Sequence, residues 1–216
     1  MQFLTFIGGL VKAEAIRKKV AREAAALLYF KLEKEYKQAK IKAAKILGVN
    51  FLPTNREIAR ELDKIAEENE GSIRQQNLVK KRREALKTMK ILKAYNPILI
   101  GSVWRGTAHR ESDIDIVVYH DKPDEILKVL KQNCRLKILQ TERVMVTKRG
   151  QKKTSLHIYL ESQSSKKIEI IVRCSEEAYQ KEKCEIYNDE ITGLRIKELE
   201  KVLKENPTQR FLPSQN

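Results

Sequence analysis

Cysteine is scarce in this chain, and its positions exclude two classes of site. Cys134, Cys174 and Cys184 form no CxxC pair, and they share the sequence with only three histidines. Neither a disulfide framework nor a zinc site is therefore indicated. A run of 18 apolar residues is also missing, and the apolar start of the sequence lacks the basic region of a signal peptide. We expect a cytoplasmic protein that does not enter a membrane.

Glycine and proline are few as well, with 8 and 5 among 216 residues, whereas 41% of the residues are hydrophobic. This balance indicates a globular protein rich in regular elements. Positive charge is in excess: the formal charge is +15, and residues 1–95 hold 22 Lys and Arg against 11 Asp and Glu. A basic half favours a polyanionic partner such as nucleic acid, although a solvated Lys- and Glu-rich surface is the alternative.

The hydrophobic pattern divides the chain into a helical part and a mixed part. Apolar residues recur at helical spacing over residues 10–47, and two capping patterns open further helices at Thr54 and Ser72. After residue 96, short apolar strands alternate with helices. We predict an α+β fold, in which a helical module precedes a mixed β-sheet flanked by helices. Its parts are a basic α-helical module in 1–95, a sheet domain in 96–206 and a tail in 207–216.

Two aspartates interrupt an otherwise apolar strand at residues 113–119. Asp113 and Asp115 point to one face of this strand, because side chains alternate along it. Two adjacent carboxylates are costly to bury without a partner. A divalent cation removes that cost, since hard oxygen ligands at close range suit Mg²⁺. The alternative is a solvent-facing strand with two incidental aspartates.

A small polar loop lies ten residues before the aspartates. Gly101 ends an apolar strand and lets the backbone approach a phosphate, and Ser102 adds a hydroxyl and an amide. An arginine in the same loop can reach a phosphate oxygen. The sequence therefore predicts a nucleotide-binding loop with contacts from Gly101, Ser102, Arg105, Gly106 and Ser112.

The combined motif resembles that of the DNA polymerase β-type nucleotidyltransferase superfamily. Ile100-Gly101-Ser102, a ten-residue spacer and Asp113-Ile114-Asp115-Ile116 carry the resemblance, which covers residues 97–120. The stretch looks most like minimal nucleotidyltransferases, and it is similar to head domains of archaeal CCA-adding enzymes and of oligoadenylate synthetases. The resemblance implies transfer of a nucleoside monophosphate from an NTP, with ATP expected, to an acceptor hydroxyl, releasing pyrophosphate.

The superfamily also implies a third carboxylate on a later strand. Glu169 stands inside an apolar strand at residues 166–173, whereas the alternative, Glu161, lies at the end of its strand. Many relatives carry Asp at this place, so Glu is a departure. The resemblance then implies that Asp113, Asp115 and Glu169 are catalytic and hold two Mg²⁺ ions, which Mn²⁺ can replace.

A strongly basic segment precedes the first strand. Between Arg74 and Lys93 there are eight Lys and Arg and a single acid. A solvated helix normally alternates charges, so this one favours a phosphate backbone. We predict nucleic-acid binding through Lys80, Lys81, Arg82, Arg83 and Lys87. RNA is therefore one expected acceptor. A protein hydroxyl, as in antitoxin-like adenylylating enzymes, and a non-catalytic nucleotide- or nucleic-acid-binding module are the alternatives.

Overall fold

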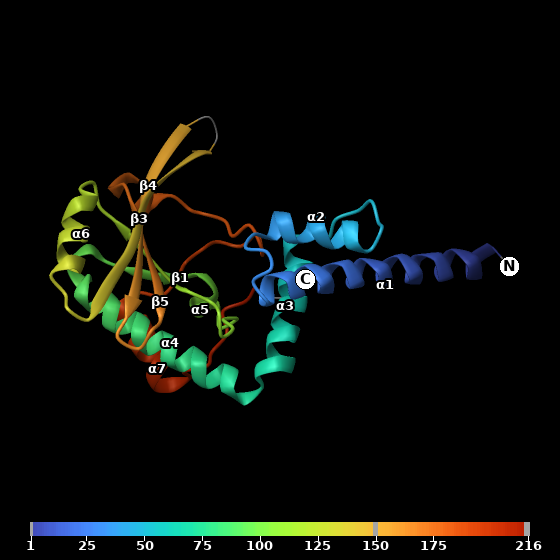
Figure 1. Cartoon of the computed structure of the whole chain (residues 1–216), viewed down its shortest axis with the longest axis horizontal. Helices are drawn as coiled ribbons and strands as arrows, with labels where there is room; N and C mark the ends of the chain where they lie inside the picture. Colours follow the sequence, from blue (N-terminus) through green and yellow to red (C-terminus); the bar gives the residue numbers. More distant parts are fainter. Residues whose placement is uncertain (1, 149–150, 214–216) are drawn as a thin grey trace. The chain divides into compact units, whose positions relative to one another are not determined.

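The computed structural model describes the backbone of residues 2–148 and 151–213, and the side chains of residues 13–145 and 153–213. The described part contains the α+β fold expected from the sequence (Figure 1). Its helices are α1 (Gln2–Tyr29), α2 (Tyr36–Ile46), α3 (Asn55–Glu70), α4 (Ser72–Ile91), η1 (Lys93–Tyr95), α5 (Gly101–Arg105), α6 (Pro123–Lys131), η2 (Ser175–Tyr179) and α7 (Ile196–Glu205). Its strands are β1 (Ile98–Ile100), β2 (Ile114–Tyr119), β3 (Leu136–Lys148), β4 (Gln151–Ser162) and β5 (Lys167–Arg173).

The chain forms two compact units, which we describe separately. The first comprises Met1–Ser72 with Cys184–Asn188, and the second comprises Ile73–Lys183 with Asp189–Asn216. The sequence places a boundary near residue 95, but helix α4 belongs to the second unit, because its buried apolar side chains lie in the core of the sheet. The segments 1–95, 96–206 and 207–216 remain a proposal for the domains.

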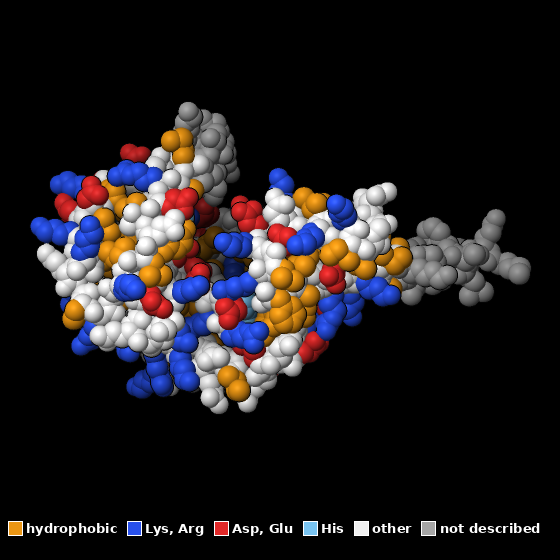
Figure 2. All heavy atoms as spheres, viewed as in Figure 1, with side chains coloured by type: hydrophobic (Ala, Val, Ile, Leu, Met, Phe, Trp, Pro, Cys, Tyr) orange, Lys and Arg blue, Asp and Glu red, His pale blue; other side chains and the backbone are white. Residues whose placement is uncertain are grey.

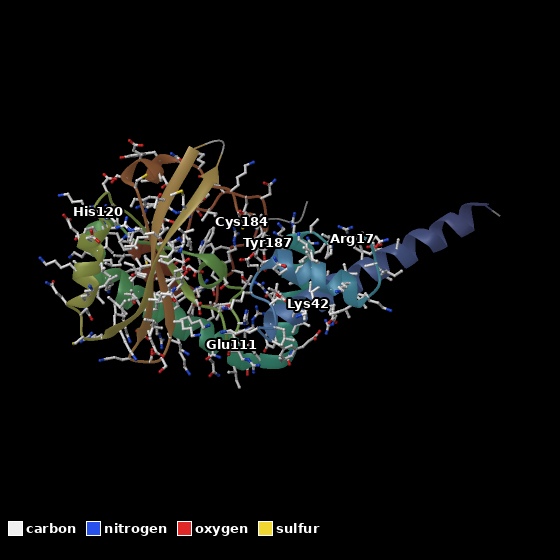
Figure 3. All side chains as sticks on the ribbon, turned by 45° about the horizontal axis from the view of Figure 1, so that its top comes forward. Arg17, Lys42, Glu111, His120, Cys184 and Tyr187 are labelled. Atoms are coloured by element: carbon white, nitrogen blue, oxygen red, sulfur yellow. The ribbon has the colours of Figure 1, made fainter. Side chains whose placement is uncertain are left out.

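Alanine-rich helices build the first unit. Ala24 of α1, Ala43 of α2 and Ile58 of α3 are fully buried in one cluster, and small side chains let the helices approach closely. Helix α3 begins at the capping box predicted from the sequence, in which Thr54 and Glu57 satisfy each other's backbone amides. Arg17 of α1 (labelled in Figure 3) binds the same glutamate at 2.5 Å and lowers the pKa of Glu57 to about 2.

The helix expected over residues 10–47 is two helices. Helix α1 ends at Tyr29 and α2 begins at Tyr36. Lys31 adopts a left-handed conformation with φ of 56°, and the amide of Leu32 bonds back to the carbonyl of Leu27. This is a helix-terminating geometry that glycine usually adopts. The break carries neither glycine nor proline, so the sequence pattern concealed it.

A five-stranded sheet organises the second unit, with the order β1-β2-β5-β4-β3. Strands β2 and β5 are parallel, and the other neighbours are antiparallel. One face is apolar, because Ile114, Ile116 and Val118 of β2 lie beside the isoleucines and valine of β5 that share their register. Helices α4, α6 and α7 add buried side chains to this core, as do β1, β4 and α5. The opposite face carries the polar residues of the next section.

No helix in the described ranges is long and apolar enough to cross a bilayer.

Candidate active site

Two acids face each other across the parallel pair of central strands. Asp115 of β2 is directly opposite Glu169 of β5, and the same row continues to Tyr159 of β4. Residues in register project from the same face, so the two carboxylates share the polar side of the sheet. Glu161, the alternative third acid, pairs with Lys167 and is not in this row. The register therefore favours Glu169 over Glu161.

The backbone at Gly101 comes very close to the second aspartate. Gly101 has φ of 71°, a left-handed conformation that favours glycine, and a Cβ placed on it would lie 2.0 Å from Oδ2 of Asp115. The first residue of α5 must therefore be glycine. The close approach places the first residue of the segment 101–112, which we call the glycine loop, beside the acidic row.

The acidic row shifts the ionisation of its buried aspartate. Burial, followed by the charges of Glu169 and Asp113, raises the pKa of Asp115 to about 8, although the Lys81 ammonium opposes the shift. Asp113 is exposed, and it flanks the row at the start of β2. Asp113, Asp115 and Glu169 supply carboxylate oxygens of the kind that a hard divalent cation prefers.

The residues therefore fit a divalent metal, although their side chains are not arranged around one. Among the described side chains, no three of the His, Cys, Asp and Glu residues form a group ready to hold a metal ion. Glu169 instead accepts a hydrogen bond from the ring of His157. Two observations support the fit of these residues to a divalent metal. The space beside Gly101 would be filled by a Cβ, and the three carboxylates offer hard oxygen donors.

His157 takes part in a hydrogen-bonded chain that the sequence did not reveal. Its Nδ1 lies 2.6 Å from Oε1 of Glu169, and its Nε2 lies 2.9 Å from Oγ of Ser155. Tyr159, on the same face, has a pKa raised to about 12 by burial and by the Glu169 carboxylate. Alternation along the strand places residues 155, 157 and 159 on one face, but only the register with β5 shows that Glu169 lies beside them.

Arg105 and Gly106 have structural roles in place of the phosphate contacts predicted for them. The Arg105 side chain is 5% exposed, forms a two-pronged ion pair with Asp189 at 2.7 and 3.0 Å, and stacks over the Trp104 ring. Gly106 has φ of 74°, and a Cβ there would lie 2.8 Å from the carbonyl oxygen of Gln209. A buried, paired guanidinium is not a free phosphate ligand, so we retain no nucleotide contact for these two residues.

Ser102 and Ser112 lie at opposite ends of the glycine loop. Ser102 is partly exposed near the start of α5, next to Gly101, so its hydroxyl stays a candidate for phosphate contact. Ser112 uses its Oγ to accept the amide of His109 at 3.0 Å, which shapes the turn before the aspartates. Trp104, in the same loop, is 4% exposed and belongs to the core.

The basic segment of α4 separates into an inner and an outer set. Lys81 and Arg82 are 2% and 0% exposed, and they donate hydrogen bonds to backbone carbonyls of the glycine loop. These two cannot offer a surface to nucleic acid, because the chain itself surrounds them. Lys80, Arg83 and Lys87 are exposed and keep the predicted surface. Figure 2 shows Lys and Arg side chains gathered over α4 and α7.

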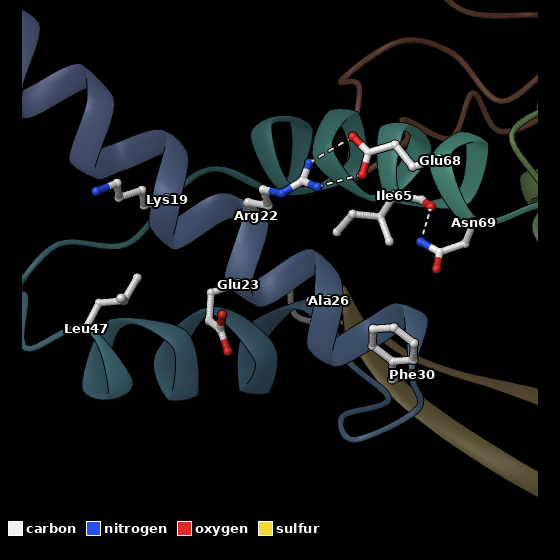
Figure 4. A pocket seen from close by; sticks show the side chains of 9 residues that line it. All are labelled: Lys19, Arg22, Glu23, Ala26, Phe30, Leu47, Ile65, Glu68 and Asn69. Atoms are coloured by element: carbon white, nitrogen blue, oxygen red, sulfur yellow. Dashed lines mark hydrogen bonds and ion pairs between the residues drawn. The ribbon is translucent and has the colours of Figure 1, made fainter.

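A pocket of about 410 Å³ opens in the first unit, and none of the residues that line it is a predicted site residue (Figure 4). Its wall is partly apolar, and Arg22 and Glu68 form an ion pair at 2.6 Å on its rim. The lining comprises Lys19, Arg22, Glu23, Ala26, Phe30, Leu47, Ile65, Glu68 and Asn69. It lacks the carboxylate row and the glycine loop, so it has no place in the chemistry described above.

Known proteins resemble the second unit. Residues 79–205 match the model of the nucleotidyltransferase domain NTP_transf_2. No curated protein matches the chain. Among solved structures, a cytoplasmic RNA terminal U-transferase is 21% identical with a TM-score of 0.32, over 52% of this chain and 35% of that one. The Cid1 poly(U) polymerase bound to MgATP is 19% identical with a TM-score of 0.32, over 52% and 38%. A chain of the GLD-2/RNP-8 complex is 12% identical to this chain with a TM-score of 0.33, and the match covers 55% of this chain and 48% of that one.

The chain thus spans less than half the length of each of these solved structures. The family match is more extensive, because it covers over half of this chain and contains the glycine loop, both aspartates and Glu169. With the loop and the acidic row assembled on one face of the sheet, the protein belongs to the nucleotidyltransferase domain family, within the DNA polymerase β-type superfamily.

Proposed function

We propose that this nucleotidyltransferase moves AMP from ATP to a hydroxyl of RNA, with release of pyrophosphate, and that it depends on Mg²⁺. The observation that carries the proposal is the pairing of Asp115 with Glu169 across parallel strands, with Asp113 beside them and the glycine loop in contact. Nucleotidyltransferases of this kind are generally dependent on divalent metals.

Asp113, Asp115 and Glu169 would hold the metal through their carboxylate oxygens. Bound divalent ions neutralise the triphosphate and lower the pKa of the attacking hydroxyl. The chain's own contribution is position: the left-handed backbone at Gly101 admits the triphosphate beside the acids, and the Ser102 hydroxyl donates to a phosphate oxygen. This reaction needs little covalent help from the protein, so the carboxylates should dominate the effects of mutation.

The exposed basic residues of α4 support RNA as the acceptor. Lys80, Arg83 and Lys87 lie on the outer side of a helix that carries a single acid, Glu84. Lys87 pairs with Glu84 at 3.4 Å, and its own side chain is 68% exposed, so this pair is a weak one. Most of the positive charge on this surface is therefore available to a phosphate backbone.

The direct test is incubation with each α-³²P-labelled NTP and Mg²⁺, in the presence of total RNA and cell protein. We expect label from ATP in RNA, and we expect its loss in the Asp113→Asn, Asp115→Asn double variant. Label in protein instead would make the enzyme a protein adenylylating one and would refute RNA as the acceptor. The absence of label sensitive to the double variant, with every nucleotide and both acceptors, would refute catalysis and favour a binding module.

A second experiment isolates the acceptor surface. The triple variant Lys80→Gln, Arg83→Gln, Lys87→Gln should weaken binding of single-stranded RNA and flatten its salt dependence by about two in log–log slope. A control with the same loss of charge replaces three exposed lysines on and beside α6: Lys122, Lys128 and Lys131. If both triple variants lose the same affinity, the binding reflects net charge and the α4 surface is not the acceptor site.

A further inference from the structure

Three cations of α4 point inward and bind the same stretch of backbone. Arg74 donates to the carbonyls of Thr107 and Ala108 at 2.9 and 3.1 Å. Lys81 donates to the carbonyls of His109 and Arg110 at 2.8 and 3.1 Å, and to that of Ser112. Arg82 donates to Val103 and Trp104 at 3.1 and 2.9 Å. We call Arg74, Lys81 and Arg82 the carbonyl clamp.

The clamped carbonyls belong to a segment that regular structure does not satisfy. Helix α5 is five residues long, and its last carbonyls have no following turn to bond with. From residue 106 to residue 113 the chain runs through turns and irregular backbone before β2 begins. Buried carbonyls in such a segment need donors from elsewhere, and the clamp supplies them along most of the spacer between Ser102 and Asp113.

Arg82 also ties the loop to the C-terminal segment, residues 207–213. Its guanidinium donates to the carbonyls of Pro207 and Gln209 at 2.8 and 2.7 Å, in addition to the two loop carbonyls. The amide of Phe211 donates to the carbonyl of Arg105 at 3.0 Å, which adds a backbone tie to the same loop. The segment expected to be a free tail is therefore part of the loop's support.

We propose that Lys81, with Arg74 and Arg82, positions the glycine loop for nucleotidyl transfer. This rests on the proposed function. The three carbonyls that Lys81 binds lie directly before Asp113, and Gly101 at the other end of the loop touches Asp115. The clamp thereby fixes the position of Gly101 and Ser102, the end of the loop proposed to bind phosphate, relative to Asp113 at the end proposed to bind metal. Its cations touch neither substrate nor metal in this role, so they are positioning residues.

Lys81→Met is the informative substitution, because methionine keeps a long apolar stem and removes the three donors. Trp104 is the only tryptophan in the chain and lies inside the loop, so its emission reports the loop directly. We expect emission at longer wavelength, faster amide exchange over residues 103–112, and weaker binding of Mn²⁺ measured by electron paramagnetic resonance. Misplacement of reacting groups by about 1 Å costs on the order of a hundredfold in rate, so kcat should fall by that much with a smaller change in KM.

The matched control is Lys90→Met, in the same helix with an exposed side chain paired to Glu200 at 2.7 Å. It should leave Trp104 emission and loop exchange as in the wild type. Lys81→Arg, which keeps the charge and several donors, should restore loop protection and most of kcat. Arg74→Met, which removes the donors to Thr107 and Ala108, replaces Lys81→Met should that variant not fold, with the same expected loop readouts.

Wild-type loop exchange and wild-type emission in Lys81→Met would overturn the proposal. So would equal effects of Lys81→Met and Lys90→Met on both loop readouts, or a loosened loop with unchanged kcat. These loop readouts need neither nucleotide nor acceptor. A failure of nucleotidyl transfer in the wild type would therefore refute the proposed function, whereas a wild-type loop in Lys81→Met would refute the clamp.

Discussion

Binding of a divalent cation at the acidic row should release a proton from Asp115. Without metal, burial and the neighbouring acids hold the pKa of this carboxyl at about 8. At pH 7 such a group is about nine-tenths protonated, and at pH 9 about one-tenth, so cation binding should release roughly 0.9 and 0.1 proton. The apparent affinity for the cation should accordingly rise with pH and level off above pH 8.

Isothermal titration calorimetry with Mg²⁺ or Mn²⁺ measures this release directly. Repeating each titration in two buffers of different ionisation enthalpy, at pH 7 and at pH 9, gives the number of protons per cation. Glu161→Gln serves as the control. This acid is outside the row, so its loss should not change the number of protons released per cation at pH 7 or at pH 9. Release near zero at pH 7 would contradict the description of Asp115, and altered release in Glu161→Gln would point to that glutamate as the third ligand.

The same pKa fixes the sign of the stability change with pH. Between pH 4 and pH 8 the folded, metal-free protein keeps a proton on Asp115 that the unfolded chain has released. Stability from this group therefore falls as pH rises through that window, which is opposite to the usual behaviour of a salt-bridged carboxylate. In Asp115→Asn this contribution disappears, so denaturant unfolding of the variant should depend less on pH over the window.

Three further substitutions test other parts of the structure. Gly101→Ala should abolish transfer and destabilise the fold by about 1–3 kcal/mol, measured by urea unfolding, because the left-handed backbone and the adjacent carboxylate leave no room for a Cβ; wild-type activity would refute the close approach. Asp189→Asn should cost roughly 3–5 kcal/mol by removing the carboxylate charge that pairs with the buried Arg105 guanidinium, and an unchanged urea midpoint would count against that pair. Thr54→Ala should cost about 1 kcal/mol through loss of the capping box, seen as a lower thermal midpoint, and a midpoint equal to wild type would show the cap to be redundant.

Much of the architecture could be predicted from local pattern. The alternation of apolar and polar residues located β2 and β5 within one residue of their observed bounds. The loop and aspartate motif identified the family, because Gly101, Ser102 and the two aspartates carry their meaning in a short stretch of sequence. These features depend on neighbours along the chain, which a sequence displays.

The direction in which α4 faces could not be predicted in the same way. Its basic residues indicated a solvated or nucleic-acid-facing helix, yet Lys81 and Arg82 are buried beneath the loop while Lys80 and Arg83 are exposed. Lys and Arg side chains rarely lie fully buried. Here backbone carbonyls accept their hydrogen bonds and offset the cost of burying the charge, and such carbonyls have no signature in a sequence. The His157–Glu169 bond was hidden for a related reason, since it depends on the register between β4 and β5.

The parallel pairing of β2 with β5 sets an order of assembly for the active site. Between the two strands lie α6 and the β3–β4 hairpin, whose contacts are local in sequence and can form within microseconds. Joining β2 to β5 requires closing the whole intervening segment, which is slow, and it brings Asp115 and Glu169 face to face. We therefore expect the acidic row to be completed late in folding, after the β3–β4 hairpin that leads into β5.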